Sequence, residues 1–253
     1  MIILKSGREI DIMYEANQIV AETLAYLEEK IAPGISTAEI NRLGEELIEG
    51  KGAEPSFRGY RGYPASVCVS INEEVVHGSP SGERILEDGD IVSLDIGAYY
   101  RGFHGDAART FPVGDIDKKS ERLIEIAERS FYEGLEEAVA GAYLSNISHR
   151  IQTFVEDNNY SVVREYVGHG IGRDMHEDPQ IPNFGPPDRG PKLKTGMTLA
   201  IEPMVNIGGY EVRTLDDGWT VVTEDKSLSA HYENTIAITG DGPRILSIIE
   251  NNN

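Results

Sequence analysis

The spacing of apolar side chains predicts two helices within the first 50 residues. Each helical stretch follows a capping-box pattern, in which a serine precedes a glutamate by three positions. The two pairs are Ser6 with Glu9 and Ser36 with Glu39. Pro33 and Gly34 separate the helices, because neither residue favours a helix interior. We therefore expect an N-terminal helical region over about residues 6–50.

The pattern becomes strand-like after about residue 60 and then alternates between the two kinds of element. Strand patterns occur at 67–71 and 91–100, and helical patterns at 117–141 and around 147–155. Strands and loops are expected from Tyr160 onward. Five prolines between 179 and 191 predict that this stretch is irregular. The chain is thus predicted to have a mixed α/β (α+β) fold.

A weak internal repeat relates two parts of the chain. Each copy has a His-Gly pair, then a turn glycine, a strand, and an acidic residue six positions after that glycine. A second acid follows downstream, with a histidine two residues before it. The acids are Asp95 and Asp106 in one copy, and Glu202 and Glu233 in the other. We expect a single domain over residues 1–253, with related halves at about 60–140 and 160–245 facing each other across a pseudo-twofold axis.

Composition narrows the classes of partner and compartment. The chain has 23 Lys and Arg against 43 Asp and Glu, which gives a formal net charge of −20. Nucleic acid and anionic membranes are therefore disfavoured as partners, because both require clustered cations. The one cysteine, Cys68, permits no internal disulfide and no Cys-rich zinc site. No secretory signal or run of ~18 apolar residues is present, so a cytoplasmic location is expected.

The four repeated acids carry the strongest chemical signal. Asp95 lies inside an apolar strand pattern, and an unpaired buried carboxylate is costly. For any one acid, an arginine partner or a backbone cap is the ordinary explanation. Four such acids in repeat order, in a chain with few cations, instead predict divalent metal ions. Two ions balance four carboxylates, His169 can add a neutral ligand, and manganese, iron, cobalt and zinc all suit such a site.

Five stretches resemble the short bacterial type I methionine aminopeptidases, and the resemblance covers nearly the whole chain. They are residues 62–80, 88–111, 165–179, 196–205 and 216–239. The resemblance implies the pita-bread α/β fold, formed by a single catalytic domain around a dinuclear metal site. The implied metal ligands are Asp95, Asp106, His169, Glu202 and Glu233. Of these, Asp106 and Glu233 are expected to bridge the two ions.

The resemblance also implies the catalytic residues. A metal-activated hydroxide would attack the scissile carbonyl, with Glu202 as the proton acceptor. His77 would contact the substrate near the scissile amide, and His176 would contact the carbonyl oxygen and stabilise the developing oxyanion. The remaining histidines are expected to be structural or solvent-facing: His104, His149 and His231.

An apolar pocket for the terminal methionine is implied as well. Its expected residues are Phe57, Tyr60, Tyr63, Cys68, Met175 and Trp219. Ordinary core packing is the alternative explanation, most of all for Cys68. Met175 stands where an aromatic residue often occurs in the family, and Phe57 where some relatives have cysteine. The pocket can therefore differ in shape while remaining apolar.

The implied activity is removal of the initiator methionine from nascent proteins whose second residue is small. The expected partners are nascent N-termini and a transient ribosome contact, and the expected state is a monomer. One alternative is a proline-directed peptidase of the same fold. Those enzymes usually carry a further N-terminal domain, for which the ~60 residues before the first motif leave no room. The other alternative is a non-catalytic binding module, which the presence of all five ligands and both histidines disfavours.

Overall fold

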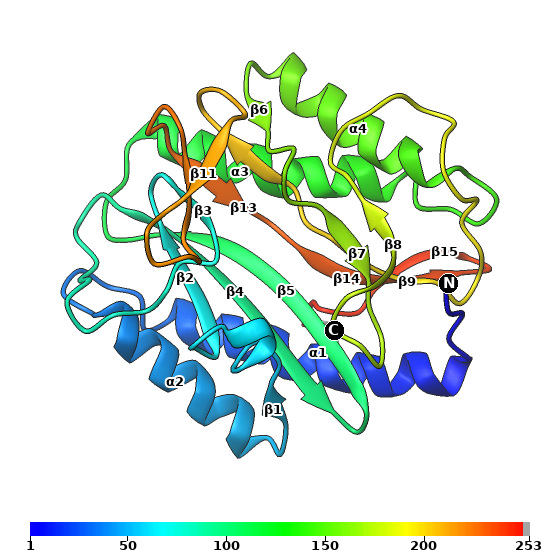
Figure 1. Ribbon diagram of the computed structural model, residues 1–253, viewed down its shortest axis with the longest axis horizontal. Coiled ribbons are helices and arrows are strands. Elements are labelled where there is room, and N and C mark those ends of the chain that lie inside the picture. Colours follow the sequence, from blue (N-terminus) through cyan, green and yellow to red (C-terminus); the bar gives the residue numbers. More distant parts are fainter. Residues whose placement is uncertain (250–253) are drawn as a thin grey trace.

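The computed structural model describes residues 1–249 and places two pairs of helices on opposite sides of a β-rich interior (Figure 1). The first pair is α1 (Gly7–Glu28) and α2 (Thr37–Gly50). The second pair is α3 (Lys118–Leu135) and α4 (Leu144–Asp157). No helix within residues 1–249 is both long and apolar enough to cross a lipid bilayer.

The capping prediction is confirmed for α1 and half confirmed for α2. Ser6 accepts a hydrogen bond from the amide of Glu9, and the carboxylate of Glu9 accepts one from the amide of Ser6. Ser36 likewise caps α2 by accepting from the amide of Glu39. The carboxylate of Glu39, however, bonds to the guanidinium of Arg42 at 2.6 and 2.8 Å. An exposed ion pair one turn along the helix thus replaces the second capping bond.

The first helix pair packs on an antiparallel sheet formed by the N-terminal part of the chain. Its strands are β1 (Glu54–Pro55), β2 (Val67–Ile71), β4 (Ile91–Tyr100) and β5 (Phe103–Pro112). Strand β4 pairs with β1 and β2, and also forms a long hairpin with β5. Apolar residues of α1, α2 and these strands form one buried cluster. A short 3-10 helix, η1 (Tyr60–Gly62), precedes β2.

The second helix pair covers the C-terminal sheets. A five-stranded antiparallel sheet has the order β15-β14-β9-β7-β8. Its strands are β7 (Gly168–Gly170), β8 (Glu177–Ile181), β9 (Thr198–Ile201), β14 (Asn234–Thr239) and β15 (Gly242–Ile245). Strands β6 (Ser161–Val162), β10 (Met204–Asn206) and β13 (Ser229–His231) form a second sheet. A further sheet, of order β11-β12-β3, joins β11 (Val212–Thr214) and β12 (Val221–Thr223) to β3 (Glu74–Val76) from the N-terminal part of the chain.

Two boundaries differ from the sequence prediction. Helix α3 ends at Leu135 instead of continuing to residue 141, and Val139 is exposed in the turns that follow. Pro179 lies in strand β8, so the prediction that the proline-rich stretch is irregular is wrong for its first residues. Strand β8 is at the edge of its sheet, where a residue without an amide hydrogen can be accommodated.

Candidate active site

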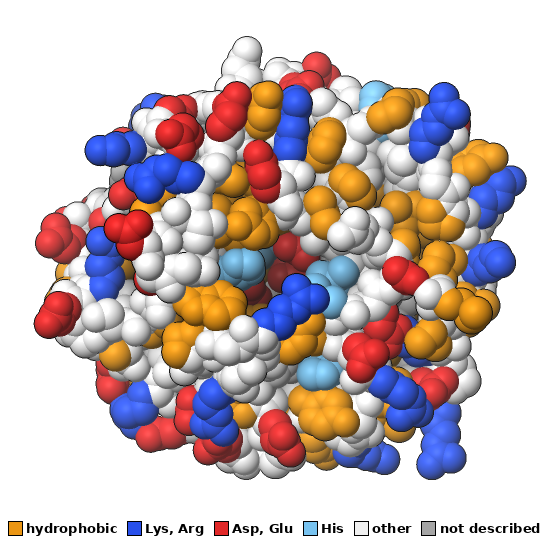
Figure 2. Space-filling view, viewed as in Figure 1, with side chains coloured by type: hydrophobic (Ala, Val, Ile, Leu, Met, Phe, Trp, Pro, Cys, Tyr) orange, Lys and Arg blue, Asp and Glu red, His pale blue; other side chains and the backbone are white. Residues whose placement is uncertain are grey.

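One cavity of about 190 Å³ brings together every residue that the sequence predicts for the site. Figure 2 shows this hollow near the middle of the face, with acidic and histidine side chains at its floor and hydrophobic side chains beside it. Arg61 also lines the cavity and is missing from the sequence prediction. The sequence position of Arg61 could have indicated this, because it lies between Tyr60 and Tyr63 in a segment predicted to form the substrate pocket.

The strand pairing places the four acids as two pairs, one in the β4–β5 hairpin and one at the end of the β9–β14 ladder. In the β4–β5 hairpin, Asp95 faces Ala108 and Asp106 faces Gly97, so the two acids are two ladder positions apart and share one face. Glu202 directly follows β9 and Glu233 directly precedes β14. These two strands pair antiparallel, so both glutamates lie at the same end of their ladder.

Hydrogen bonds between the β4–β5 hairpin and the start of β14 fix Asp106 and Glu233 relative to one another. The amide of Glu233 donates to the carbonyl of Ala108 at 2.9 Å. The hydroxyl of Thr235 donates to the carbonyl of Asp106 at 2.9 Å. Arg109 adds a hydrogen bond from its guanidinium to the carbonyl of Glu233. The backbone of both acids is therefore held by direct contacts between strands that are far apart in sequence.

His169 is oriented by its own strand. Its Nδ1 donates to the carbonyl of Gly170 at 2.9 Å, which leaves the lone pair of Nε2 facing the acids. That nitrogen lies 3.7 Å from Asp106 Oδ2 and 3.7 Å from Glu202 Oε1. Burial lowers the pKa of His169 to about 4, so the ring is uncharged at pH 7 and its Nε2 can act as a metal ligand. A side chain at Gly170 would meet the carbonyl oxygen of Asp178 at 2.2 Å, so this strand position requires glycine.

The electrostatics of the acids indicate that a cation belongs among them. Burial raises the pKa of Asp95 to about 7. Burial and the charges of the neighbouring acids also raise the pKa of Asp106, Glu202 and Glu233 well above the ordinary range. One carboxylate oxygen each of Asp95, Asp106 and Glu233 is buried without a hydrogen-bond partner. Unsatisfied buried oxygens are costly, and a bound cation would satisfy them.

The donor geometry fits a divalent metal. Asp106, His169 and Glu233 each offer a ligand atom, and these atoms all lie within 4.8 Å of one another. Glu202 borders the same cluster through its contact with His169, and Asp95 lines the same cavity. Four carboxylates and one imidazole form an oxygen-rich set of the kind that manganese, iron, cobalt and zinc accept. The residues present therefore fit a metal centre.

The two proposed catalytic histidines lie at the cavity from different loops. His176 is exposed, stacks on Tyr60, and shares a 2.9 Å hydrogen bond between its Nδ1 and the hydroxyl of Tyr60. Partial desolvation, with the nearby His169 and the charge of Arg61, lowers the pKa of His176 to about 3. His77 packs edge-on against Tyr166, and burial lowers its pKa as well. Both rings are therefore neutral hydrogen-bonding groups at pH 7.

The apolar residues gather on one side of the cavity. All six predicted pocket residues belong to a single cluster, in which Phe57, Tyr63, Cys68 and Met175 are buried. Tyr63 packs edge-on against Trp219, and its hydroxyl donates to the carbonyl of Gly78 at 2.8 Å. Burial raises the pKa of the Cys68 thiol, which keeps it uncharged. The cluster thus places an apolar surface beside the acids.

The other three histidines lie outside the cavity lining. His104 shares a 2.8 Å hydrogen bond between its Nδ1 and the hydroxyl of Ser56. His149 is exposed at the surface. His231 is buried, and its Nε2 lies 3.9 Å from Glu233 Oε2, so it borders the acid cluster without lining the cavity.

Comparison with known proteins connects this geometry to a group of hydrolases. The sequence profile of metallopeptidase family M24 matches residues 11–240. A methionine aminopeptidase of Clostridium perfringens is 59% identical over 250 residues, which cover 99% of this chain and 100% of that protein. The crystal structure of a Thermotoga maritima methionine aminopeptidase superposes with a TM-score of 0.97 at 44% identity, covering 98% of this chain and all of that one. A Pyrococcus furiosus prolidase gives a TM-score of 0.80 at 25% identity, covering 98% of this chain and 66% of the prolidase.

Proposed function

The chain belongs to metallopeptidase family M24, and from this premise we infer that it hydrolyses the peptide bond after an N-terminal methionine. The observation that carries this inference is a single cavity in which an acid cluster that could hold a metal adjoins an apolar pocket. Full-length similarity to methionine aminopeptidases, in sequence and in fold, supports the same activity. The chain is thus an aminopeptidase with the pita-bread fold.

The activity depends on divalent metal, and we propose that two ions bind. Asp95, Asp106, His169, Glu202 and Glu233 would hold them, with Asp106 and Glu233 between the two. Four carboxylates balance the charge of two divalent ions, and the unpaired oxygens of three of these residues support the assignment. A bound ion supplies Lewis-acid chemistry that makes water a better nucleophile at neutral pH. Calorimetric titration of the metal-free protein should show two ions per chain.

Three side chains around this centre are proposed to have separate catalytic roles. Glu202 borders the metal cluster and is proposed to accept the proton of the attacking water. Tyr60 can donate its hydroxyl hydrogen to Nδ1 of His176, which leaves the hydrogen of that ring on Nε2. His176 can then donate to the scissile carbonyl oxygen as negative charge develops there. His77, which lines the same cavity, is proposed to contact the substrate near the scissile amide.

The apolar pocket accounts for the choice of terminal residue. Phe57, Tyr60, Tyr63, Cys68, Met175 and Trp219 are proposed to surround the methionine side chain. An unbranched thioether suits such a surface, and each methylene lost from the substrate costs roughly 1–3 kcal/mol in a fitted apolar pocket. Alanine at the first position should therefore be a poor substrate. A small second residue is proposed to be required, as the family resemblance implies.

The substrates are the N-termini of nascent proteins, and the finer setting is a proposal. We propose that the enzyme acts in the cytoplasm as a monomer and contacts the ribosome transiently. The net charge of −20 disfavours direct binding to ribosomal RNA, so we expect any ribosome contact to be made with protein. Co-sedimentation with ribosomes would test the ribosome contact, and light scattering would test the monomeric state.

A peptide panel tests the function directly. Peptides beginning Met-Gly, Met-Ala, Met-Ile, Ala-Ala and Ala-Pro should be compared at equal loading with manganese, iron and cobalt in turn. We expect turnover of Met-Gly and Met-Ala only. Preference for Ala-Pro would instead assign the chain to the proline-directed peptidases whose fold it shares. Activity on none of the peptides with any metal would favour the binding module.

A further inference from the structure

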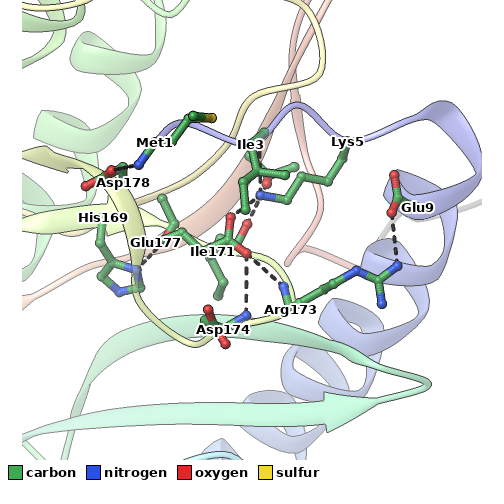
Figure 3. A network of polar contacts seen from close by, with 12 residues as sticks. Met1, Ile3, Lys5, Glu9, His169, Ile171, Arg173, Asp174, Glu177 and Asp178 are labelled. Carbon is green, nitrogen blue, oxygen red and sulfur yellow. Dashed lines mark hydrogen bonds and ion pairs between the residues drawn. The ribbon is translucent and has the colours of Figure 1, made fainter.

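The loop that carries Met175 and His176 into the cavity is folded around the carboxylate of Glu177 (Figure 3). The amide of Arg173 donates to Glu177 Oε1 at 2.9 Å, four residues earlier in the chain. The amide of Asp174 lies 3.4 Å from the same oxygen. The carboxylate therefore binds the backbone of the loop across its interior, and the position of the carboxylate determines the position of the loop.

Lys5 holds the other oxygen of this carboxylate from a distant part of the sequence. Its Nζ donates to Glu177 Oε2, and the two side chains are only 3% and 4% exposed. Lys5 belongs to the segment before α1, and its backbone amide donates to the carbonyl of Gly196 at 2.7 Å. The segment is therefore fixed to the C-terminal sheet region before its side chain reaches the loop.

Gly172 shows how closely this ion pair is packed into the loop. A side chain at this position would meet Glu177 Oε1 at 2.4 Å and the Cε atom of Lys5 at 2.4 Å. The carbonyl of Gly172 also accepts a hydrogen bond from the amide of His104 in β5, at 2.8 Å. The loop is thus clamped between the ion pair on one side and the β4–β5 hairpin on the other.

A second contact to the same loop, made by α1, is weaker. The guanidinium of Arg173 lies 3.1 Å from Glu9 Oε1 and over the ring of Phe103, but its side chain is 65% exposed. Exposed ion pairs contribute little to stability. Removing one partner of a buried pair is far more costly, because it leaves an uncompensated charge. Lys5 is therefore the contact on which the loop geometry depends.

We propose that Lys5 is a positioning residue for the hydrolysis, acting through Glu177 and the 172–176 loop on His176. This inference rests on the proposed function, in which His176 donates to the scissile carbonyl oxygen. Without Lys5, the carboxylate of Glu177 turns toward water and the loop follows. A misplaced His176 then stabilises the developing oxyanion less, while the metal ligands and most of the apolar pocket remain in place.

A double-mutant cycle between Lys5 and His176 tests the proposal. The variants are Lys5→Met, His176→Ala and the combination, assayed on a Met-Ala peptide at equal metal loading. Lys5→Met should lower kcat roughly tenfold, since small displacements of catalytic groups carry such costs, and change KM less than about twofold. In the His176→Ala background the same substitution should change kcat less than about twofold. The metal Kd from calorimetry should be unchanged.

Lys51→Met is the matched control. Lys51 forms an ion pair with Glu22 of α1, but this pair is 43% exposed on both sides and lies away from the loop. Its kcat should equal that of the wild type. If Lys5→Met fails to fold, Lys5→Gln replaces it: its carboxamide can still donate to Glu177 but carries no charge, so it should show a smaller loss of kcat with the same dependence on His176.

A measurement independent of turnover completes the test. Amide hydrogen exchange in residues 172–176 should be faster in the Lys5→Met protein than in the wild type or in Lys51→Met. An equal loss of kcat in both His176 backgrounds, or unchanged exchange, would overturn the positioning role. A wild type that is inactive on Met-Ala would instead refute the proposed function, and the exchange result would still decide whether Lys5 holds the loop.

Discussion

Glu202 has two roles in the proposed reaction, as a metal ligand and as the acceptor of a proton. Substitution by glutamine tests these roles without changing the shape of the side chain. Glu202→Gln keeps the volume and removes the basic oxygen. We expect a folded protein with turnover reduced at least ~10²-fold, the usual scale for loss of a general base. Metal content should also fall, so activity must be compared at equal loading.

Glu74→Gln is the control for this substitution. The side chains of Glu74 and Glu202 are both 14% exposed, but Glu74 lies outside the cavity, where it accepts from the amide of Ile71 at 2.8 Å. Its turnover should remain near that of the wild type. Near-normal turnover of Glu202→Gln at full metal loading would contradict the assignment of the base.

Tyr60 and Tyr63 allow a second prediction at the residue scale, because their hydroxyls serve different partners. The hydroxyl of Tyr60 bonds to His176, and that of Tyr63 bonds to the carbonyl of Gly78. Tyr60→Phe should lower kcat by roughly 2- to 10-fold, the equivalent of one ordinary hydrogen bond, with little change in melting temperature. Tyr63→Phe should chiefly lower the melting temperature. The opposite pattern would show that Tyr60 does not orient the histidine.

At the scale of elements, α3 packs so tightly against α4 that a glycine in α3 should be more stabilising than alanine, although alanine is usually the better residue in a helix. A side chain at Gly134, in the last turn of α3, would meet Ile151 Cγ1 of α4 at 2.6 Å. Gly134→Ala should therefore lower the free energy of unfolding by ~1–3 kcal/mol, as overpacking does. Chemical denaturation at fixed metal loading would measure the change.

Gly50 provides the matched position in α2. It ends that helix and has no atom within 4 Å of the place where a side chain would lie. Gly50→Ala should raise the free energy of unfolding by up to ~1 kcal/mol, because alanine favours the helix. Similar effects from the two substitutions would mean that α3 and α4 separate readily.

At the scale of the whole molecule, the crowded acids make the stability of the metal-free protein depend on pH. The folded-state pKa of Asp95 is raised from 3.8 to about 7, so its contribution is present below about pH 4 and is lost as the pH rises through 7. The buried histidines have the opposite effect. The pKa of His169 is lowered from 6.5 to about 4, so its contribution to stability is present above pH 6.5 and is lost as the pH falls through 4. The two effects oppose each other between pH 4 and 6.5, and above pH 6.5 the acids act alone.

The melting temperature of the metal-free protein should therefore fall as the pH rises from about 6.5 to 8. Each proton held only by the native state corresponds to ~1.4 kcal/mol per pH unit. Saturating metal should reverse the trend, adding ~2.7 kcal/mol when free metal exceeds its Kd a hundredfold. Calorimetric scans after verified chelation would measure both effects. A flat or rising melting temperature without metal would contradict a buried acid cluster.

Much of the fold could be predicted from the sequence because the local sequence patterns agree with the tertiary structure. The capping serines predicted the start of α1 and α2, and a run of mostly apolar residues predicted β4 at residues 91–100. The mixed α/β fold and the family are confirmed, whereas the bounds of the two related halves stay a prediction. The cavity contains all the predicted site residues, and their individual roles stay predictions.

The sequence by itself predicted the chemistry of the centre, because four acids in repeated strand contexts have few neutralising partners other than metal ions. Only the tertiary structure decided how that chemistry is held. The end of α3 at Leu135, the place of Pro179 on a sheet edge and the entry of Arg61 into the cavity all depend on neighbours distant in sequence. The pairing of Lys5 with Glu177, 172 residues away, is of the same kind. No local pattern encodes such a contact, since a lysine near the start of a chain is ordinarily solvated and becomes an anchor only when the fold buries it.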